Sequence, residues 1–374
     1  MKKVGIMSMQ RIVNYGSFLQ AYALKQLVQQ QGCDVEFVDY HVGKPVIEDN
    51  NESNNKLIRK FKKGIELIKY KAPLKQKIQF LRYKESFQNK YFSILGINDS
   101  YNYNPNLDCL IIGSDEVFNC IQKNSNVGYS LELFGKDNNA KKLISYAASF
   151  GNTTLEKLKK YNKEQEIAEL LKKFDAISAR DNNSSKIVEE LTGSKPVYNL
   201  DPVLMYDYMH ECNEIPTLNI NEKYLILYAY SGRISKYESK WISKYAKNKG
   251  LKIYTIGGIQ SCGDKFIDCS PFEILAYFKN AEEVITDTFH GSIFSIINHK
   301  RFSTVVRKSN GNEYGNEEKL SDLLSSLNLK ERIVTSIEDV ENVNSIGINY
   351  DDVDKLIKSY RKQTKEYLES NLKD

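Results

Sequence analysis

Short apolar runs alternate with longer amphipathic segments from the start of the chain. Residues 3–9, KVGIMSM, have the length and apolar content of a buried strand, and residues 34–40, DVEFVDY, are the next strand candidate. Between them, residues 17–31 carry apolar side chains at helical spacing, and Gly32 is suited to end a helix. The pattern predicts a strand, a helix and a second, parallel strand.

The same alternation continues to residue 205. Helices are predicted over 155–173 and 183–192, and each apolar run around them ends in small or polar residues. Strands separated by helices form a parallel sheet, whose carboxyl ends gather ligands. The four further strand candidates are LDCLIIG (107–113), KKLISYAASFG (141–151), FDAISAR (174–180) and PVYNLDP (196–202).

A segment without periodicity, residues 206–223, separates this half from a second series of the same kind. We therefore predict an α/β protein with two α/β domains facing each other across a cleft that holds the site. The predicted domains span 1–205 and 206–345, and a polar helix within 346–374 is expected to pack back on the first domain. The strand candidates of the second series are KYLILYAY (223–230), LKIYTIGG (251–258), EEVITDT (282–288) and RFSTVV (301–306), with helices over 234–248 and 271–279 and after Gly291.

Positive charge is concentrated in a predicted helical insertion, residues 54–92. This insertion holds 12 Lys and Arg against 2 Glu, although the 374-residue chain has a net charge of only +5. One interpretation is a solvated helical insertion on either side of Pro73; another is contact with an anionic membrane surface or a polyphosphate-linked substrate. No nucleic-acid-binding motif accompanies the charge, so nucleic acid is not an expected partner.

Other features of the composition indicate a cytoplasmic protein without a disulfide scaffold or a structural metal site. No apolar stretch approaches the roughly 20 residues that span a bilayer, and the apolar run near the first residue is too short for a signal peptide. We expect a cytoplasmic protein, with peripheral contact at the inner face of the cell membrane through 54–92 as a hypothesis. The six cysteines lack the spacing of zinc sites, which predicts reduced, buried thiols.

Two strand exits in the first half carry candidate binding groups. Asn14 and Tyr15 precede Gly16 at the start of a predicted helix, where backbone N–H groups can meet a ligand, although a purely structural turn is the alternative. Ser114, Asp115 and Glu116 follow Gly113, where a sugar hydroxyl could be bound or deprotonated. Helix capping by Ser114 or Asp115 is the alternative there.

Two further exits carry a cation and a titratable ring. Arg180 follows an apolar strand, at a position suited to binding a carboxylate or phosphate, unless it pairs with Asp181 or Asp201. His290 lies in TDTFHG, between a strand and an apolar helix, and this places a titratable group beside a helix N-terminus that favours anions.

These segments, taken in order, resemble the polysaccharide pyruvyl transferase family. The chain departs from the usual family pattern at Glu116, Phe118 and Thr288, where Gln, Trp and often Ser are found. The resemblance covers most of residues 1–335. Its motifs are NYGSFLQAYAL (14–24), IIGSDEVFN (111–119), SYAASFG (145–151), ISARD (177–181), LDPVL (200–204) and ITDTFHGSIFS (285–295).

The resemblance implies two Rossmann-like domains, arranged as in the B-type glycosyltransferases, and a specific reaction. The enolpyruvyl group of phosphoenolpyruvate would be transferred to two hydroxyls of one sugar, giving a cyclic pyruvate ketal and phosphate. The acceptor sugar would belong to a surface polysaccharide or its lipid-linked precursor. No cofactor or metal is called for.

Roles can be assigned to the candidate residues on this basis. We expect His290 to be the acid that protonates the donor, or an imidazolium that stabilises the leaving phosphate. We expect Asp115 to act as a base or to bind a hydroxyl. The expected donor-binding residues are Arg180, Gly291, Ser292 and Lys319, the last of which could instead be a surface lysine, and the expected acceptor-binding residues are Asn14, Tyr15, Ser114 and Glu116.

Two competing hypotheses remain open at the level of sequence. A glycosyltransferase of B-type fold that uses a nucleotide sugar would share the same two-domain architecture. A non-catalytic glycan-binding member of the family is the other, suggested by the departures at Glu116 and Phe118.

Overall fold

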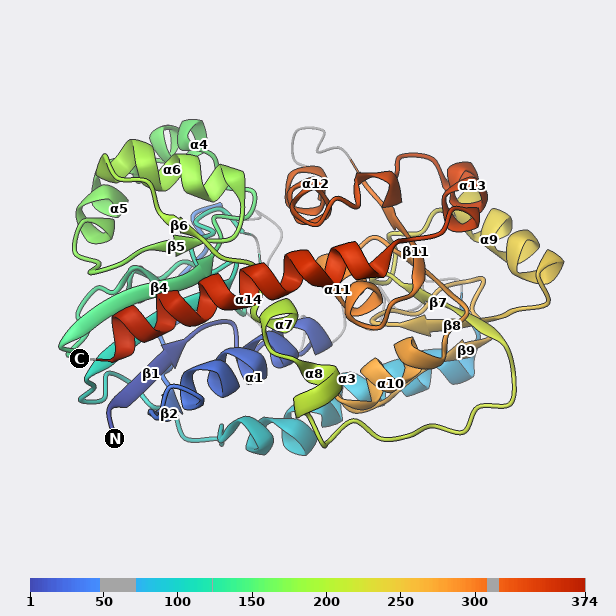
Figure 1. The fold of residues 1–374 in the computed structure, drawn as a ribbon, viewed down its shortest axis with the longest axis horizontal. Helices are drawn as coiled ribbons and strands as arrows, with labels where there is room; N and C mark the ends of the chain where they lie inside the picture. The colour runs from blue at the N-terminus through green and yellow to red at the C-terminus, as the bar shows by residue number, and fades with distance from the viewer. Residues whose placement is uncertain (48–71, 123, 308–315, 374) are drawn as a thin grey trace. The chain divides into compact units, whose positions relative to one another are not determined.

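The computed structural model describes residues 1–47, 72–122, 124–307 and 316–373. It contains two parallel sheets flanked by helices, which confirms the α/β class and the two Rossmann-like halves predicted above (Figure 1). Residues 54–71 of the predicted basic insertion lie outside the described ranges, and its remaining residues belong to a helix, α3 (Leu74–Leu95).

The chain divides into two compact units. Unit 1 comprises Met1–Asp49, Asn89–Asp207 and Asp354–Asp374, and unit 2 comprises Asn50–Gln88 and Tyr208–Val353. The division at 207 and 208 lies two residues beyond the boundary expected from the sequence, and the end of the chain belongs to unit 1.

The sheet of unit 1 has the strand order β2-β1-β3-β4-β5-β6, with every neighbouring pair parallel. In register, Met7 at the end of β1 pairs with Ile112, and Asp115 at the end of β3 pairs with Ala148. The elements are β1 (Lys3–Met7), α1 (Tyr15–Gln29), β2 (Asp34–Phe37), β3 (Cys109–Asp115), η1 (Leu131–Phe134), β4 (Lys142–Ala148), α4 (Leu155–Lys160), α5 (Glu164–Leu171), β5 (Ser178–Ala179), α6 (Asn182–Thr192), β6 (Val197–Tyr198), α7 (Pro202–Met205) and most of α14 (Tyr350–Leu372).

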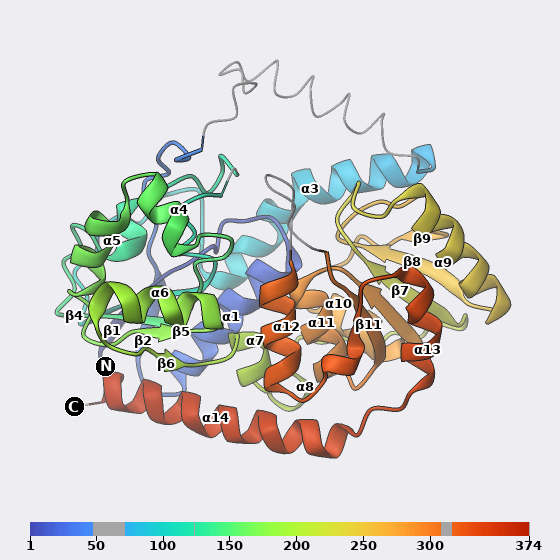
Figure 2. The same cartoon turned by 90° about the horizontal axis from the view of Figure 1, so that it is seen from above.

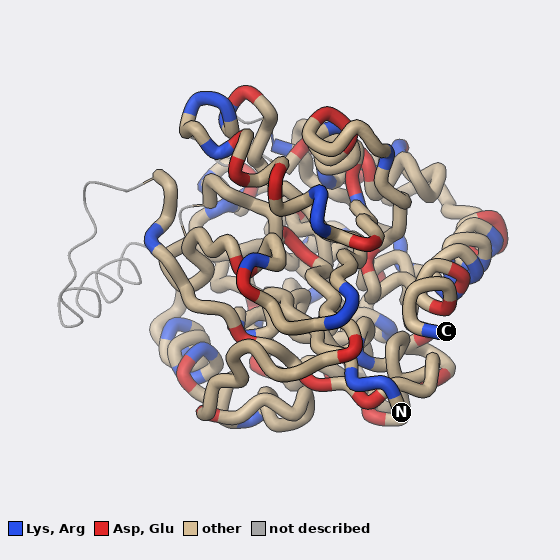
Figure 3. The backbone as a smooth tube through the Cα atoms, turned by 90° about the vertical axis from the view of Figure 1, so that its left-hand side faces the viewer, with Lys and Arg blue, Asp and Glu red and all other residues tan. Residues whose placement is uncertain are grey.

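Helices cover both faces of this sheet, which explains why the central strands β3 and β4 are almost continuously buried, whereas the edge strand β2 alternates exposed and buried positions. On one face, Met7, Ile112 and Leu143 join a core cluster with Ile167 of α5 and Ile187 of α6. Helix α1 lies on the other side of the sheet from α4, α5 and α6 (Figure 1). Basic and acidic positions are interspersed along the backbone on the side of unit 1 that carries both chain ends (Figure 3).

Helix α14 packs on unit 1. Tyr367 Oη donates to the Ser145 carbonyl at 2.7 Å, and Arg361 Nη1 pairs with Asp207 Oδ2 at 2.7 Å. Leu368, about two turns from Arg361 and next to Tyr367, is completely buried. Although the sequence of this helix is mostly polar, one of its faces is apolar and packs into the core of unit 1.

The sheet of unit 2 has the order β12-β11-β10-β7-β8-β9, again with every neighbouring pair parallel. Strand β10 therefore lies between β11 and β7. The elements are α8 (Tyr208–Glu211), β7 (Tyr224–Tyr228), α9 (Lys236–Asn248), β8 (Lys252–Ile256), β9 (Lys265–Phe266), α10 (Glu273–Asn280), β10 (Glu283–Thr286), α11 (Phe289–Ile297), β11 (Arg301–Val305), α12 (Glu317–Ser326), η2 (Lys330–Arg332), β12 (Ile333–Val334), η3 (Ile337–Asp339) and α13 (Val340–Ser345).

Among the described residues, no helix is both long enough and apolar enough to cross a membrane. All six cysteines are free thiols, and five of them are buried, as expected from their spacing.

Shortening Leu368 tests the packing of α14. We expect Leu368→Ala to lower the free energy of unfolding by about 2–5 kcal/mol, because it removes buried methyl groups and leaves a cavity. Lys362→Ala, on the same helix with a side chain that is 80% exposed, should change it by less than about 0.5 kcal/mol. Urea unfolding measures both values, and equal stabilities of Leu368→Ala and the parent protein would contradict the packing described.

Candidate functional site

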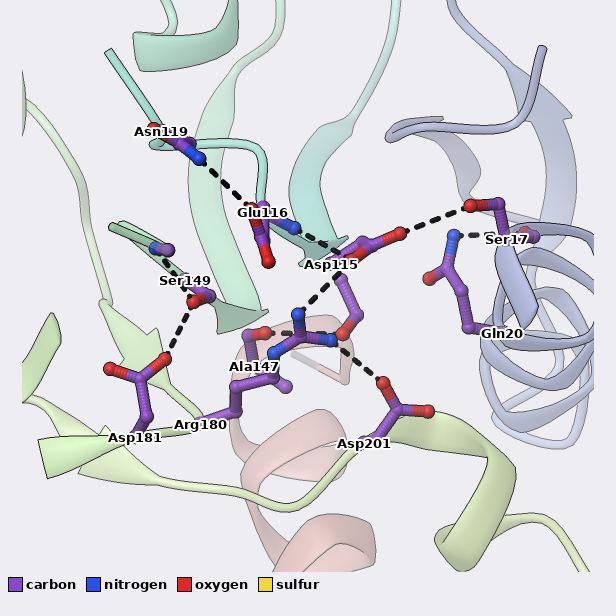
Figure 4. Close-up of polar contacts among 12 residues, drawn as sticks. Ser17, Gln20, Asp115, Glu116, Asn119, Ala147, Ser149, Arg180, Asp181 and Asp201 are labelled. Carbon is purple, nitrogen blue, oxygen red and sulfur yellow. Dashed lines mark hydrogen bonds and ion pairs between the residues drawn. The ribbon is translucent and has the colours of Figure 1, made fainter. Parts of the chain in front are cut away.

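Asp115 is the centre of a polar cluster at the carboxyl edge of the unit 1 sheet (Figure 4). Its Oδ1 accepts hydrogen bonds from Arg180 Nη2 at 3.0 Å and from the Glu116 amide at 2.9 Å, and its Oδ2 accepts one from Ser17 Oγ at 3.2 Å. Its backbone has φ +75°, a conformation that non-glycine residues seldom adopt. Asp115 is therefore held in one orientation by the ends of three elements, at the position predicted for a base.

Arg180 is buried between two carboxylates. Its side chain is 3% exposed, and its Nη1 pairs with Asp201 Oδ2 at 2.9 Å while its Nη2 pairs with Asp115. Burial opposes the charged guanidinium, but the carboxylates of Asp115 and Asp201 outweigh it and raise the pKa of Arg180 above its ordinary value. The ion pair with Asp201, which the sequence left as an alternative to donor binding, is present.

The side chain of Asp181, the other carboxylate considered as a partner of Arg180, is hydrogen-bonded to two serines instead. Its carboxylate accepts from Ser149 Oγ at 2.6 Å and from the Ser184 amide at 2.7 Å, as the N-cap of α6. The small residues that follow β4 thus include Ser149, whose hydroxyl orients the residue that caps α6.

The residues expected to bind the acceptor sugar differ in their exposure. Asn14 is the N-cap of α1 and is half-buried, with its Oδ1 accepting from the Ser17 amide at 2.7 Å. Glu116 is also half-buried and accepts from Asn119 Nδ2 at 2.9 Å. Tyr15 and Ser114 are completely buried, which makes them supports of this edge.

In unit 2, buried hydroxyl groups and a glycine hold the turn that carries His290. Thr288 is the N-cap of α11, and its Oγ1 accepts from the Gly291 amide at 3.0 Å. A Cβ at Gly291 would lie 2.2 Å from Thr286 Oγ1, so only glycine fits without a shift of the turn. Ser292 Oγ lies 2.9 Å from Thr304 Oγ1 in the interior. Gly291 and Ser292, expected as donor ligands, shape the turn that presents His290.

His290 lies in the first turn of α11, half-buried, with aromatic rings around it. The ring centroids of Phe289 and Phe294 lie 5.5 Å and 6.1 Å from that of His290. This placement in the first turn of a helix agrees with the expectation from TDTFHG.

Two arginines that the sequence reading missed lie beside the same turn. Arg233 Nη1 lies 3.9 Å from Asp287 Oδ1, and Arg307 Nε lies 3.6 Å from Asp287 Oδ2. Arg307 Nη2 also donates to Glu238 Oε1 at 3.0 Å. The two arginines follow β7 and β11, the strands on either side of β10, so their relation to His290 becomes visible only once the strand order is known.

Asn316 ties this cluster together. Its Nδ2 donates to the Asp287 carbonyl at 2.8 Å, and its Oδ1 accepts from the Arg307 amide at 2.7 Å. Lys319 is half-buried in the first turn of α12, three residues further on. Asn316 thus fixes the start of the helix that carries Lys319 to the turn before His290.

Asp287 is buried completely, and its environment changes its acidity. Burial raises the pKa of Asp287 above its ordinary value, although Arg233 and Arg307 act in the opposite direction. Within the described ranges, no group of His, Cys, Asp and Glu side chains has the arrangement of a metal site.

The raised pKa of Asp287 predicts a pH dependence of stability. A carboxyl whose folded pKa exceeds its unfolded value of about 3.9 destabilises the fold as it ionises, so stability is lost as pH rises between the two values. We expect Asp287→Asn to gain stability over the parent protein across that window, by about 1.4 kcal/mol for each pH unit between the two pKa values.

Urea unfolding over a pH series measures this difference. Asp339→Asn, which removes an exposed carboxyl of the same unit, is unfolded over the same pH series as the control for the loss of a negative charge. A variant Asp287→Asn that loses stability relative to the parent as pH rises would show that the arginines dominate and keep the carboxylate ionised.

Comparison with solved structures finds distant similarity in fold. A Staphylococcus aureus MnaA structure with UDP has 13% identity and a TM-score of 0.47, with 98% of this chain and 91% of that chain covered. A UDP-GlcNAc 2-epimerase from Neisseria meningitidis bound to UDP-GlcNAc has 10% identity and a TM-score of 0.44, with 97% and 94% covered. MurG from Acinetobacter baumannii has 11% identity and a TM-score of 0.41, with both chains fully covered.

Comparison with curated proteins gives no match. The sequence model of the family described as "Polysaccharide pyruvyl transferase" matches residues 14–309. This range begins at the N-cap of α1 and includes Asp115, Arg180 and His290. The resemblance seen in the motifs is thereby confirmed, and the chain belongs to the polysaccharide pyruvyl transferase family of enzymes.

Proposed function

We propose that this transferase moves the enolpyruvyl group of phosphoenolpyruvate onto two hydroxyls of one sugar, forming a cyclic pyruvate ketal and releasing phosphate. The observation that carries the proposal is His290, in the first turn of α11 within the matched family region, beside a buried cluster with two arginines. The acceptor sugar belongs to a surface polysaccharide or to its lipid-linked precursor.

Donor binding is assigned to unit 2. Phosphoenolpyruvate carries a carboxylate and a phosphate, and each requires cationic or N–H partners. Arg233, Arg307 and Lys319 supply cations in the same unit as His290, and Gly291 and Ser292 act by holding the turn.

Arg180 of unit 1 was also expected to bind the donor, but its surroundings favour a different role. Its guanidinium already faces the carboxylates of Asp115 and Asp201, so this group of three carries a net negative charge and disfavours another anion. We propose that Arg180 acts first by holding Asp115.

The chemistry requires an acid before the sugar adds. Protonation of the donor methylene by His290 makes the phosphate-bearing carbon electrophilic, and the first sugar hydroxyl bonds to that carbon and gives up its proton. The carbon–oxygen bond to phosphate then breaks, with its electron pair and one of the two hydroxyl protons going to the phosphate, and the second hydroxyl bonds to the same carbon while the other hydroxyl proton restores His290. One donor and two hydroxyls thus give one ketal and one phosphate.

The acceptor sugar is assigned to unit 1. Asp115 is the proposed base or hydroxyl ligand, since its orientation is fixed and its cluster is net negative. Asn14 and Glu116 are proposed to contact the sugar directly, while the buried Tyr15 and Ser114 support them.

Removing the imidazole tests the donor chemistry. We expect His290→Ala to lower pyruvate transfer by at least about a hundredfold, because general acid catalysis typically contributes that much. His210→Ala, which removes an exposed histidine of the same unit, is the control and should transfer at the parental rate. Phosphate release with a panel of glycan acceptors measures the rate, and near-parental turnover by His290→Ala would remove this residue from the mechanism.

Removing either arginine tests donor binding. Phosphoenolpyruvate at about 100 times its dissociation constant should stabilise the protein by about 2.7 kcal/mol, which raises the melting temperature. Arg307→Ala and Arg233→Ala should each weaken binding at least tenfold, or about 1.4 kcal/mol, because a charged partner of the anion is lost.

The control for these variants is Arg301→Ala, which removes an exposed arginine at the start of β11. Arg307→Lys, which keeps the charge, should retain part of the shift. A shift by phosphoenolpyruvate that is unchanged in both alanine variants would contradict the assignment, and a shift only with nucleotide sugars would favour a glycosyltransferase.

A further inference from the structure

Helix α3 is fixed to unit 2 by one of its faces. The rings of Phe80 and Tyr83 pack against Phe266 of the edge strand β9, with centroid distances of 5.5 Å and 6.1 Å. Gln76 Nε2 donates to the Gly263 carbonyl at 2.9 Å in the turn before that strand. These contacts determine which face of α3 points away from the unit 2 sheet (Figure 2).

The face that points away carries an apolar stripe. Leu74, Ile78 and Leu81 are 73%, 43% and 42% exposed, and they follow one another at spacings of four and three residues. At about 100° per residue they fall within an arc of about 60°, on the side of the helix opposite Phe80 and Tyr83. Single exposed apolar residues are ordinary, but a stripe of three large ones marks an interaction surface.

Basic residues border this stripe on both sides. The same helical geometry puts Lys77 and Lys84 along one edge and Lys75 and Arg82 along the other. The helix as a whole holds five Lys and Arg against one Glu. The stripe therefore faces outward between two rows of positive charge.

This combination fits a particular partner. Long basic side chains at the borders of an apolar helical face can extend toward lipid phosphates while the apolar side chains enter the headgroup region. A solvated helix would require only the charges, and a nucleic acid would not require the exposed leucines. We propose that the Leu74, Ile78 and Leu81 face of α3 docks the protein on an anionic membrane surface.

This inference is independent of the proposed reaction, because lipid binding involves neither His290 nor Asp115. It gives the predicted basic segment a defined contact surface within its described residues. A lipid-linked acceptor would then be met at the surface where the enzyme is already concentrated.

The experiment is co-sedimentation of the full chain with vesicles of phosphatidylcholine alone and with added phosphatidylglycerol, at low and high salt. The parent protein should bind the anionic vesicles at low salt and lose binding at high salt. The triple variant Leu74→Ser, Ile78→Ser and Leu81→Ser should bind at least tenfold more weakly. The triple variant Val42→Ser, Val197→Ser and Ile346→Ser, which alters exposed aliphatic residues elsewhere, should bind like the parent.

A second measurement reports insertion directly. Ile78→Trp should show blue-shifted fluorescence with anionic vesicles and quenching by brominated lipid, whereas Ile94→Trp, which lies outside the stripe on the same helix, should not. His290→Ala should bind vesicles like the parent, which separates this inference from the catalytic proposal. The inference is overturned if the parent does not sediment with anionic vesicles, or if the serine variant of the stripe binds unchanged.

Discussion

The buried contact of one guanidinium with two carboxylates organises the carboxyl edge of the unit 1 sheet. Arg180 comes from the end of β5 and reaches Asp115 at the end of β3, across the level of β4. At that level the β4 residue is Ala148, which is paired in register with Asp115 on one side and with Ala179 on the other. A buried charge without a partner is costly, so each of the three groups requires the others. The orientation of Asp115 is a consequence of this requirement.

Unit 2 also contains a buried charged side chain between two groups of the opposite charge, but here the buried group is a carboxylate and its neighbours are arginines. Asp287 is a buried carboxylate between two guanidinium groups, at distances of 3.6 Å and 3.9 Å that are too long for hydrogen bonds. Arg180 and its two carboxylate partners carry a net charge of −1, which disfavours an anionic donor. In unit 2, Arg307 is also hydrogen-bonded to Glu238, so the charges of Arg233 and Arg307 balance those of Asp287 and Glu238, and Lys319 adds a further cation in the same unit. This difference in charge favours the proposed assignment of the donor to unit 2.

Much of this organisation could be predicted from the sequence because strand exits are local features. Asp115, Arg180 and His290 each follow an apolar run and could be found without knowing which strands are neighbours. Arg233 and Arg307 could not, since their relation to His290 depends on β10 lying between β7 and β11. The burial of individual side chains could not be predicted from the local sequence pattern either. Tyr15 and Ser292 look like site residues in the sequence, but both are completely buried in the structure. The outward direction of the stripe on α3 likewise depends on its contact with Phe266, a residue distant in sequence.

The departures from the usual family pattern have unequal consequences. Thr288 caps α11 through its hydroxyl, and serine would cap it equally well, so this difference leaves the His290 turn unchanged. Phe118 is buried in the core, where its ring stacks on that of Phe134 at 4.9 Å, so a larger aromatic residue there would alter packing without adding a group to the site. Glu116 is different, because it is half-buried beside Asp115 and brings a carboxylate where an amide is usual. A carboxylate only accepts hydrogen bonds, whereas an amide also donates them, so with the acceptor bound at unit 1 as proposed, Glu116 is the departure that changes which sugar hydroxyls are recognised.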